Sequence, residues 1–259
     1  MLTISLITPS YQHAQFLPRT IDSVLNQSGE FKLEYSVRDG GSTDGTLSIL
    51  ESYRDRLSWT SENDCGQIQA INQGLRSATG EIVGWLNSDD ILLPDALQRV
   101  AECFYRFPDC QWLHGDCLII DTDDREVRRW VSIYKRRFAR SYSFNSLLTR
   151  NFISQMTVFW RRSLLEQVGF LDPNFPLAFD YEYWLRLAKR WPPHYIPEPL
   201  AAFRWYDSSK SGANFEQQFA ENERVASLHG LHATSRRLFK KLLNKSYIAA
   251  YRLASRVSR

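Results

Sequence analysis

The sequence predicts an α/β protein with a mostly parallel central sheet flanked by helices. In the first ninety residues, short apolar strand patterns alternate with helical patterns, an order that produces parallel strands joined by right-handed crossovers. The apolar run 82–86 ends in Asn87–Ser88–Asp89–Asp90. Acidic side chains at the carboxyl end of a strand lie where such sheets bind ligands. With 259 residues, the chain can form one large domain or a domain with an appendage.

The elements of the first half follow one another regularly. After Pro94, a further helix is expected from the apolar spacing of Leu97, Val100 and Phe104. Asp44 can cap the helix that carries Leu47, Leu50 and Tyr53 on one face. The expected strands are 3–8, 33–37, 57–60 and 82–86, and the expected helices between them are 16–25, 45–53 and 67–77.

The second half is less regular. A helix is expected at 181–191, and the basic run 125–140, with Glu126 as its single acid, is interpreted as a solvated face. The expected strands are 111–120, 127–131, 156–161 and 200–206.

The end of the chain is strongly basic. From Arg236 onward it carries eight Lys or Arg residues and no acid, so we expect 213–259 to form a helical, basic extension. Leucines at helical spacing beneath these cations leave two interpretations for 232–259: contact with an anionic membrane, or packing on the preceding domain with the charges in solvent. No apolar window is long enough to span a bilayer, and Met1–Ile7 lacks the basic start of a signal peptide. A cytoplasmic location is expected, either free or on the inner face of the cytoplasmic membrane.

The motifs at the strand ends limit the kinds of ligand site that the chain can form. The turn Asp39–Thr46 reads DGGSTDGT, which matches neither the dinucleotide-binding nor the P-loop pattern. The four cysteines show no zinc-site or disulfide spacing. Two adjacent carboxylates, Asp89 and Asp90, favour Mn²⁺ or Mg²⁺, which prefer oxygen ligands and leave positions for substrate phosphates. The alternative is a solvated loop in which Asp90 caps the helix after Pro94.

Four motifs occur in order along the chain: TPSY at 8–11, DGGSTDGT at 39–46, SDD at 88–90 and FDYEYWLR at 179–186. This ordered set resembles the family 2 glycosyltransferases with the GT-A fold, and the stretches 63–74 and 158–169 are similar to that family too. The resemblance covers about residues 1–212. It implies a catalytic domain over 1–212, with a nucleotide-binding half at 1–92 and an acceptor-binding half at 93–212.

The resemblance also implies roles for individual residues on the donor side. The nucleobase contacts would be Thr8, Tyr11 and Asp39, because a carboxylate suits the N–H donor of a pyrimidine. Further positions that line the nucleotide cleft are Asp64, Gln67 and Asn72. Arg204 or Lys210 would be available to the diphosphate.

On the same resemblance, Asp90 would bind the metal, Mn²⁺ or Mg²⁺, and Asp89 would bind the donor ribose or sugar. Asp180 would be the general base that deprotonates the acceptor hydroxyl for inverting attack on the anomeric carbon. Two positions depart from the family pattern: Phe179 replaces the acid that precedes the base, and Tyr206 stands where a histidine is usual.

The function implied is transfer of a sugar from a nucleotide diphosphate, with UDP favoured, to a hydroxyl of a glycan or lipid-linked glycan during polysaccharide biosynthesis. No nucleic-acid partner is expected. Two alternatives remain at this point. A metal-dependent sugar nucleotidyltransferase would share the α/β design, although TPSY is not its Gly-rich basic loop. A non-catalytic glycan-binding protein would not need Asp39, Asp89, Asp90 and Asp180 together.

Overall fold

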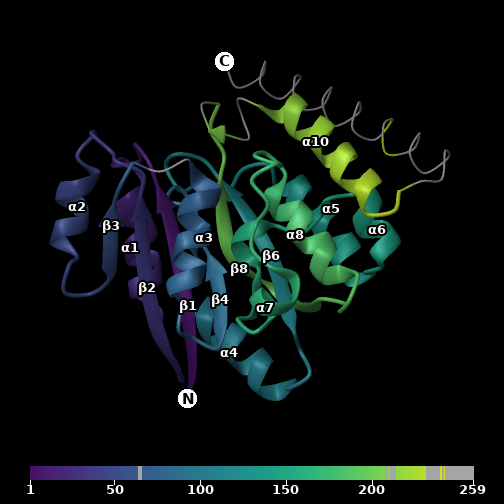
Figure 1. Cartoon of the computed structure of the whole chain (residues 1–259), viewed down its shortest axis with the longest axis horizontal. Coiled ribbons are helices and arrows are strands. Elements are labelled where there is room, and N and C mark those ends of the chain that lie inside the picture. Colours follow the sequence, from purple (N-terminus) through teal and green to yellow (C-terminus); the bar gives the residue numbers. More distant parts are fainter. Residues whose placement is uncertain (64–65, 208, 211–213, 232–239, 241, 243–259) are drawn as a thin grey trace.

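In the computed structural model, an eight-stranded mixed sheet is covered by helices on both faces (Figure 1). The strand order is β3–β2–β1–β4–β7–β6–β8–β5. The structure describes residues 1–63, 66–207, 209–210, 214–231, 240 and 242.

The amino-terminal half has the predicted alternation. Its four main strands are parallel, and the register pairs Ser10 with Asp39 and Asp39 with Ser61, so these strand ends meet at one edge of the sheet. The first and third connecting helices bury apolar stripes with i, i+3 or i+4 spacing, as Leu17, Ile21 and Val24 do in the first. The elements are β1 (Leu2–Ser10), α1 (Leu17–Leu25), β2 (Phe31–Asp39), α2 (Thr46–Ser52), β3 (Ser58–Ser61), α3 (Gln67–Ser77) and β4 (Ile82–Trp85).

Beyond β4 the sheet becomes mixed. The strand β7 runs antiparallel to β4 and β6, β8 runs parallel to β6, and the two-residue β5 runs antiparallel to β8. The elements are β5 (Ile91–Leu92), α4 (Ala96–Arg106), β6 (Trp112–Ile120), α5 (Arg129–Arg140), α6 (Phe144–Thr149), a 3₁₀ turn (Gln155–Thr157), β7 (Phe159–Arg161), α7 (Leu164–Val168), α8 (Phe179–Ala188), β8 (His194–Arg204) and α10 (Phe215–Leu228).

The strand predicted at 127–131 was wrong. Only an isolated bridge between Ile120 and Glu126 forms there, and Arg128, at φ +50°, begins the helix α5 instead. Val131, Ser132 and Ala139 are buried on the inner side of this helix, so the basic run 125–140 is solvated on its outer side alone. The apolar residues of the run are too few to distinguish a period of 2 from a period of 3.6.

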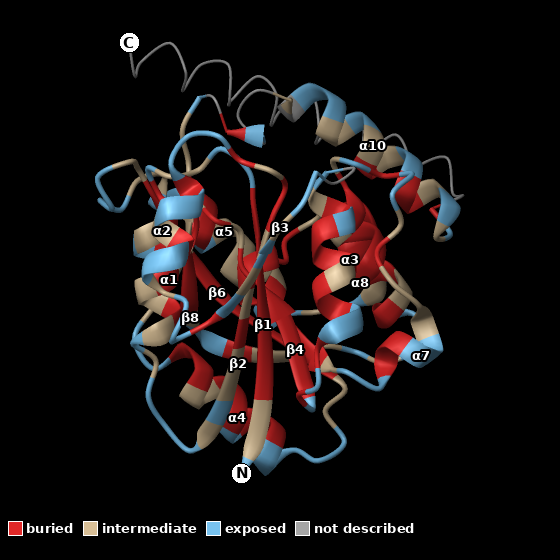
Figure 2. Ribbon diagram, turned by 60° about the vertical axis from the view of Figure 1, so that its left-hand side comes forward, coloured by how far each residue is buried: buried red, intermediate tan, exposed pale blue. Residues whose placement is uncertain are grey.

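The two faces of the sheet carry two apolar cores, because successive strand residues point to opposite sides. Ile4 and Leu6 pack with α1 and α4, whereas Ile7, Val83 and Trp85 pack with α3 and α8. Figure 2 shows the resulting burial, with β1 and β4 buried over most of their length and the outer side of α2 exposed.

Four buried tryptophans fasten α8 to the sheet. Trp184 on α8 stacks between Trp85 and Trp112, with ring centroids 5.4 and 6.0 Å away and interplanar angles of 18° and 14°. Trp160 meets Trp85 edge to face at 5.7 Å. None of the four side chains is more than 1% exposed. Aromatic pairs in such geometries contribute beyond the area that they bury, so this cluster fixes where α8 begins.

The chain after residue 212 also packs on α8. Glu221 of α10 accepts the Leu177 N–H at 2.6 Å, and His229 lies 3.2 Å from Glu182. Lys240 is 2% exposed and donates from Nζ to the Tyr181 hydroxyl at 3.2 Å. Burial lowers the pKa of Lys240 to about 7. Within the extension expected at 213–259, Phe215–Leu228 forms the helix α10, which carries three Glu and one Arg and is not basic. Residues 232–239, 241 and 243–259 lie outside the described residues, so the basic helical tail stays a prediction.

Among the residues that the structure describes, no helix combines the length and apolarity needed to cross a bilayer.

We expect Trp184→Ala to lower the free energy of unfolding by about 3–5 kcal/mol, the usual loss for a buried aromatic side chain. Urea titration followed by far-UV circular dichroism measures it. Trp130→Ala is the matched control, because Trp130 is 52% exposed and a surface change of this kind stays within about 0.5 kcal/mol. Equal losses in the two variants would contradict the role of the tryptophan cluster.

Candidate active site

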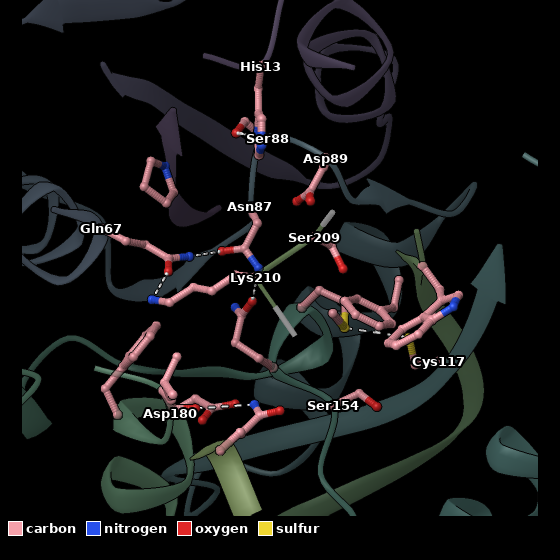
Figure 3. A pocket seen from close by; sticks show the side chains of 18 of the residues that line it. His13, Gln67, Asn87, Ser88, Asp89, Cys117, Ser154, Asp180, Ser209 and Lys210 are labelled. Carbon is pink, nitrogen blue, oxygen red and sulfur yellow. Dashed lines mark hydrogen bonds between the residues drawn. The ribbon is translucent and has the colours of Figure 1, made fainter. Parts of the chain in front are cut away.

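A pocket of about 800 Å³ opens at the carboxyl ends of the parallel strands (Figure 3). Its lining comes from the strand-end loops after β1, β2 and β4, from α5 and the start of α8, and from the segment after β8. This volume suits a nucleotide-sized ligand.

The predicted site residues divide into two groups. Tyr11, Gln67, Asp89 and Asp180 line the pocket. Asp64 lies outside the described residues. The others are buried behind the lining: Thr8, Asp39, Asn72, Asp90 and Arg204.

Asp39 organises the turn that forms one end of the pocket. Its Oδ2 accepts from the backbone N–H groups of Gly41 and Ser42 at 3.1 and 2.9 Å and from the Ser61 hydroxyl at 2.6 Å. Its Oδ1 accepts from the Ser42 hydroxyl at 2.6 Å. The carboxylate therefore already has four donors, and its contact with a nucleobase stays a prediction. Gly40, the residue beside it, does line the pocket.

Two other predicted cleft residues make internal hydrogen bonds. The Thr8 hydroxyl lies 3.0 Å from the Tyr35 hydroxyl. Asn72 pairs with the backbone of Leu171 through both its amide nitrogen and its oxygen, at 2.9 and 3.0 Å. In this arrangement Asn72 ties α3 to the loop before α8.

The adjacent acids Asp89 and Asp90 point in different directions. Asp90 is fully buried, with Oδ1 accepting the Arg204 N–H at 2.9 Å and Oδ2 accepting from the Asn87 amide at 3.2 Å. Burial, with the charge of Asp89 beside it, raises the pKa of Asp90 well above the ordinary value. Asp89 instead lines the pocket. The assignment of Asp90 as a metal ligand stays a prediction.

Arg204 supports this loop from behind. Its side chain is fully buried, donates from Nε to the Asp89 carbonyl at 2.8 Å and from Nη1 to the Asp121 carbonyl at 2.7 Å, and pairs with Asp124 at 2.5 Å. These contacts leave its guanidinium away from the pocket lining. Of the two cations considered for the diphosphate, Lys210 is the one that lines the pocket.

Tyr206 and His13 complete the surroundings of Asp89. The Tyr206 hydroxyl donates to Asp89 Oδ2 at 2.8 Å, and it lies 3.5 Å from Nε2 of His13. Nδ1 of His13 lies 2.7 Å from the Ser88 hydroxyl. Tyr206 therefore contacts the acidic loop from the position where the family often has histidine. The sequence analysis gave His13 no role in the site, and only its nearness to TPSY could have indicated one.

A chain of hydrogen bonds crosses the pocket wall from Lys210. Its Nζ donates to Gln67 Oε1 at 2.9 Å, and Gln67 Nε2 donates to Asn87 Oδ1 at 2.8 Å. Asn87 Nδ2 then donates to Gln155 Oε1 at 3.1 Å. Desolvation lowers the pKa of Lys210, while Asp180 and Glu221 oppose the shift. The network holds an ammonium group beside the acidic loop.

Asp180 lies on the other side of the pocket from Asp89, with Lys210 between them in the view of Figure 3. It starts α8, and its Oδ1 accepts the Tyr181 N–H at 2.6 Å. Burial raises its pKa, against the smaller opposing effects of that N–H and of Lys135 and Lys210. A carboxylate with a raised pKa at a pocket wall is suited to accept a proton.

Lys135 and Ser10 are two further pocket residues that the sequence analysis did not identify. Lys135 of α5 donates to the Ser154 hydroxyl at 3.1 Å and lines the pocket on the side of Asp180. The buried Ser10 hydroxyl lines the opposite end and has no hydrogen-bond partner within the described part of the chain. Lys135 could not be found from the sequence because it lies inside a basic run, whereas Ser10 belongs to TPSY.

The pocket residues fit a divalent cation that is held jointly by a carboxylate and by the phosphates of a bound donor. The described residues contain no group of three His, Cys, Asp or Glu side chains arranged around a metal. Asp89 supplies one carboxylate at the pocket. Mg²⁺ and similar ions are commonly held by one or two carboxylates together with substrate phosphates and water, so this donor set fits such an ion when a diphosphate is bound.

Comparison with known proteins identifies the family. The model of glycosyl transferase family 2 matches residues 5–169. An uncharacterized glycosyltransferase of Mycobacterium tuberculosis is 28% identical over 232 residues, which cover 88% of this chain and 84% of the relative. A PGL/p-HBAD biosynthesis glycosyltransferase of Mycobacterium bovis is 29% identical over 188 residues, which cover 70% of this chain and 68% of the relative. The chain belongs to glycosyl transferase family 2 and is a glycosyltransferase.

Solved structures show the same fold. S. aureus TarS in complex with UDP superposes with a TM-score of 0.67 at 19% identity, covering 95% of this chain and 71% of that one. The mannosyltransferase PcManGT from Pyrobaculum calidifontis, in complex with GDP-Man and Mn²⁺, gives a TM-score of 0.64 at 19% identity, covering 98% and 79%. The predicted GT-A architecture is confirmed.

Asp90→Ala should lower the free energy of unfolding by roughly 1–3 kcal/mol, because the buried Arg204 N–H loses its acceptor. Asp90→Asn keeps an acceptor oxygen and should lose less. Asp89→Ala, which removes a pocket-facing group, should change stability by less than about 1 kcal/mol. Urea denaturation of the three variants measures the order, and a larger loss in Asp89→Ala than in Asp90→Ala would refute the supporting role of Asp90.

Proposed function

We propose that the protein is an inverting, metal-dependent glycosyltransferase that transfers a sugar from a nucleotide diphosphate to a hydroxyl of a glycan or lipid-linked glycan, in polysaccharide biosynthesis. The observation that carries this proposal is the presence of two pocket carboxylates with distinct surroundings, Asp89 and Asp180, in a chain of this family. TarS is similar in fold and was solved with UDP and with UDP-GlcNAc, which supports UDP as the nucleotide. PcManGT was solved with GDP-Man, so the nucleobase of the donor is to be determined by experiment.

The nucleoside is proposed to occupy the end of the pocket lined by Ser10, Tyr11 and Gly40. Tyr11 is 60% exposed and offers a ring for stacking, and the Ser10 hydroxyl offers an unused donor or acceptor. Asp39 would stabilise this end of the pocket by holding the conformation of the Gly40–Ser42 turn. A direct contact between Asp39 and the nucleobase is the more specific hypothesis.

The cation, Mn²⁺ or Mg²⁺, is proposed to be held by Asp89 at the pocket and by the donor diphosphate. Asp90, whose oxygens each accept one hydrogen bond, from the Arg204 N–H and the Asn87 amide, would be the alternative ligand through its remaining lone pairs. When bound, the ion supplies Lewis-acid stabilisation of the departing diphosphate. The Lys210 ammonium, fixed by Gln67, would stabilise the same negative charge.

Asp180 is proposed to be the base. Its carboxylate takes the proton of the acceptor hydroxyl as that oxygen forms a bond to the anomeric carbon and the bond from this carbon to the diphosphate oxygen breaks. Attack from the face opposite the diphosphate inverts the anomeric centre. The positions of Asp89 and Asp180 on different sides of the pocket support this geometry.

We expect UDP to bind more tightly in Mn²⁺ than in EDTA, and Asp89→Asn to remove most of this difference because the metal loses its pocket carboxylate. Isothermal titration calorimetry measures both affinities. Asp90→Asn is the comparison: if it, and not Asp89→Asn, removes the metal effect, Asp90 is the ligand as first predicted. Equal UDP affinity in Mn²⁺ and EDTA for the wild type would refute the metal proposal.

We expect Asp180→Asn to lower kcat by at least about 100-fold while UDP affinity stays unchanged, because the amide keeps the shape but cannot accept the proton. The ionised form is the active one, and burial raises the pKa of Asp180. The rate of the wild type should therefore fall as the pH drops through a pKa above the ordinary carboxyl value.

The assay for this variant is donor hydrolysis, or transfer once an acceptor is known, across UDP, GDP and dTDP sugars. Asp172→Asn is the control, since Asp172 lies in the loop before α8 and its carboxylate accepts from Asn174 of the same loop. Turnover by Asp180→Asn near that of the wild type would exclude Asp180 as the base.

A further inference from the structure

The outer face of α5 has an unusual composition for a solvent-exposed helix. Trp130 and Ile133 are 52% and 58% exposed, and they lie one turn apart. Arg129 and Arg137 are exposed beside them. The helix sequence Arg129–Arg140 contains no acid. Single exposed apolar residues are common, but a Trp and an Ile on one helix face between arginines form a defined amphipathic surface.

The cations of this face are available to an outside partner. No carboxylate in the described part of the chain forms an ion pair with Arg129 or Arg137, whereas Arg136, on the flank of the helix, pairs with the buried Asp116 at 2.7 Å. Asp116 also accepts from the Tyr195 hydroxyl at 2.6 Å. These contacts anchor α5 to β6 and β8.

The inner face of the same helix is part of the active-site wall. Val131, Ser132 and Lys135 line the pocket. Figure 1 shows α5 with α6 on the side of the molecule far from α2. A partner on the outer face would therefore lie one helix diameter, about 10 Å, from the pocket.

We propose that this outer face binds the surface of an anionic phospholipid bilayer, with Trp130 and Ile133 in the headgroup region and Arg129 and Arg137 on lipid phosphates. Tryptophan is favoured at the interface between membrane and water, and cations near an anionic leaflet strengthen binding by roughly fivefold each. Two apolar side chains are too few for the core of a stable protein interface, which buries about 800 Å² per partner. Charge and size together favour a bilayer.

The membrane contact itself does not depend on the proposed function. If that function is correct, however, the contact has a use: it sets the Asp180 side of the pocket against the membrane, where a lipid-linked acceptor would present its hydroxyl. The surface is made of other residues than the segment 232–259, for which the sequence analysis considered membrane contact.

The test is co-sedimentation of the full chain, without donor or acceptor, with vesicles of phosphatidylcholine alone or with added phosphatidylglycerol. The wild type should bind only the anionic vesicles, and less at high salt, because screening weakens the phosphate contacts. Trp130→Ser with Ile133→Ser, and separately Arg129→Gln with Arg137→Gln, should each lower the partition coefficient at least about tenfold.

Matched controls remove the same chemical groups elsewhere. Tyr105→Ser takes away an aromatic side chain that is 88% exposed on α4, and Lys32→Gln with Lys189→Gln takes away two exposed cations; both should bind as the wild type does. Thermal unfolding and UDP titration check that all variants are folded.

A second measurement locates the contact. Brominated lipids should quench less tryptophan fluorescence in Trp130→Phe than in the wild type, because the other tryptophans would stay away from the lipid. Absence of wild-type binding to anionic vesicles, or wild-type binding by both α5 variants, would overturn the inference whatever the outcome of the activity assays.

Discussion

The stack of Trp184 on Trp85 is the contact on which the rest of the site depends. Trp85 ends β4, and the chain then enters the loop that carries Asp89. Trp184 lies one helical turn after Asp180. The stack therefore joins the two pocket walls at their bases, through rings that have no exposed surface to lose. Because such interiors are packed as densely as crystals, the separation of the two carboxylates is set by the core rather than by the loops.

The adjacent acids Asp89 and Asp90 have different roles because their side chains lie in different surroundings. Asp90 is buried and holds the backbone of β8 through the Arg204 N–H, while Asp89 reaches the pocket and meets Tyr206. The loop between β4 and β5 is thereby fixed to the far part of the sheet. A single buried acid thus supports the exposed one, and Arg204 supports both through its contact with the Asp89 carbonyl.

The elements that depend on local sequence patterns could be predicted from the sequence, whereas the contacts between distant segments could not. The alternation β1 to β4 follows from short-range periodicity, and its strands and helices were predicted to within two residues at each end. The helix α5 was missed because its apolar residues are sparse and its burial depends on the Asp116–Arg136 pair, made with a distant strand. Motif matches identified Asn72 and Arg204 as polar residues near the cleft, but whether such a side chain faces the ligand or the protein is decided by its partners: Leu171 for Asn72, and Asp121 and Asp124 for Arg204.

The chain beyond residue 212 has a consequence for what counts as the minimal folding unit. Three groups on and beside α8 take partners from it: the Leu177 N–H from Glu221, Glu182 from His229, and the Tyr181 hydroxyl from Lys240. Glu182 also pairs with Arg186, and the Tyr181 hydroxyl also donates to the Leu147 and Leu148 carbonyls. A chain cut after residue 212 would therefore remove the Glu221 acceptor of the Leu177 N–H and reduce the partners of the other two groups. The terminal segment is in this sense part of the folding unit that contains α8, and its evolutionary exchange is constrained by that helix as well as by the surface.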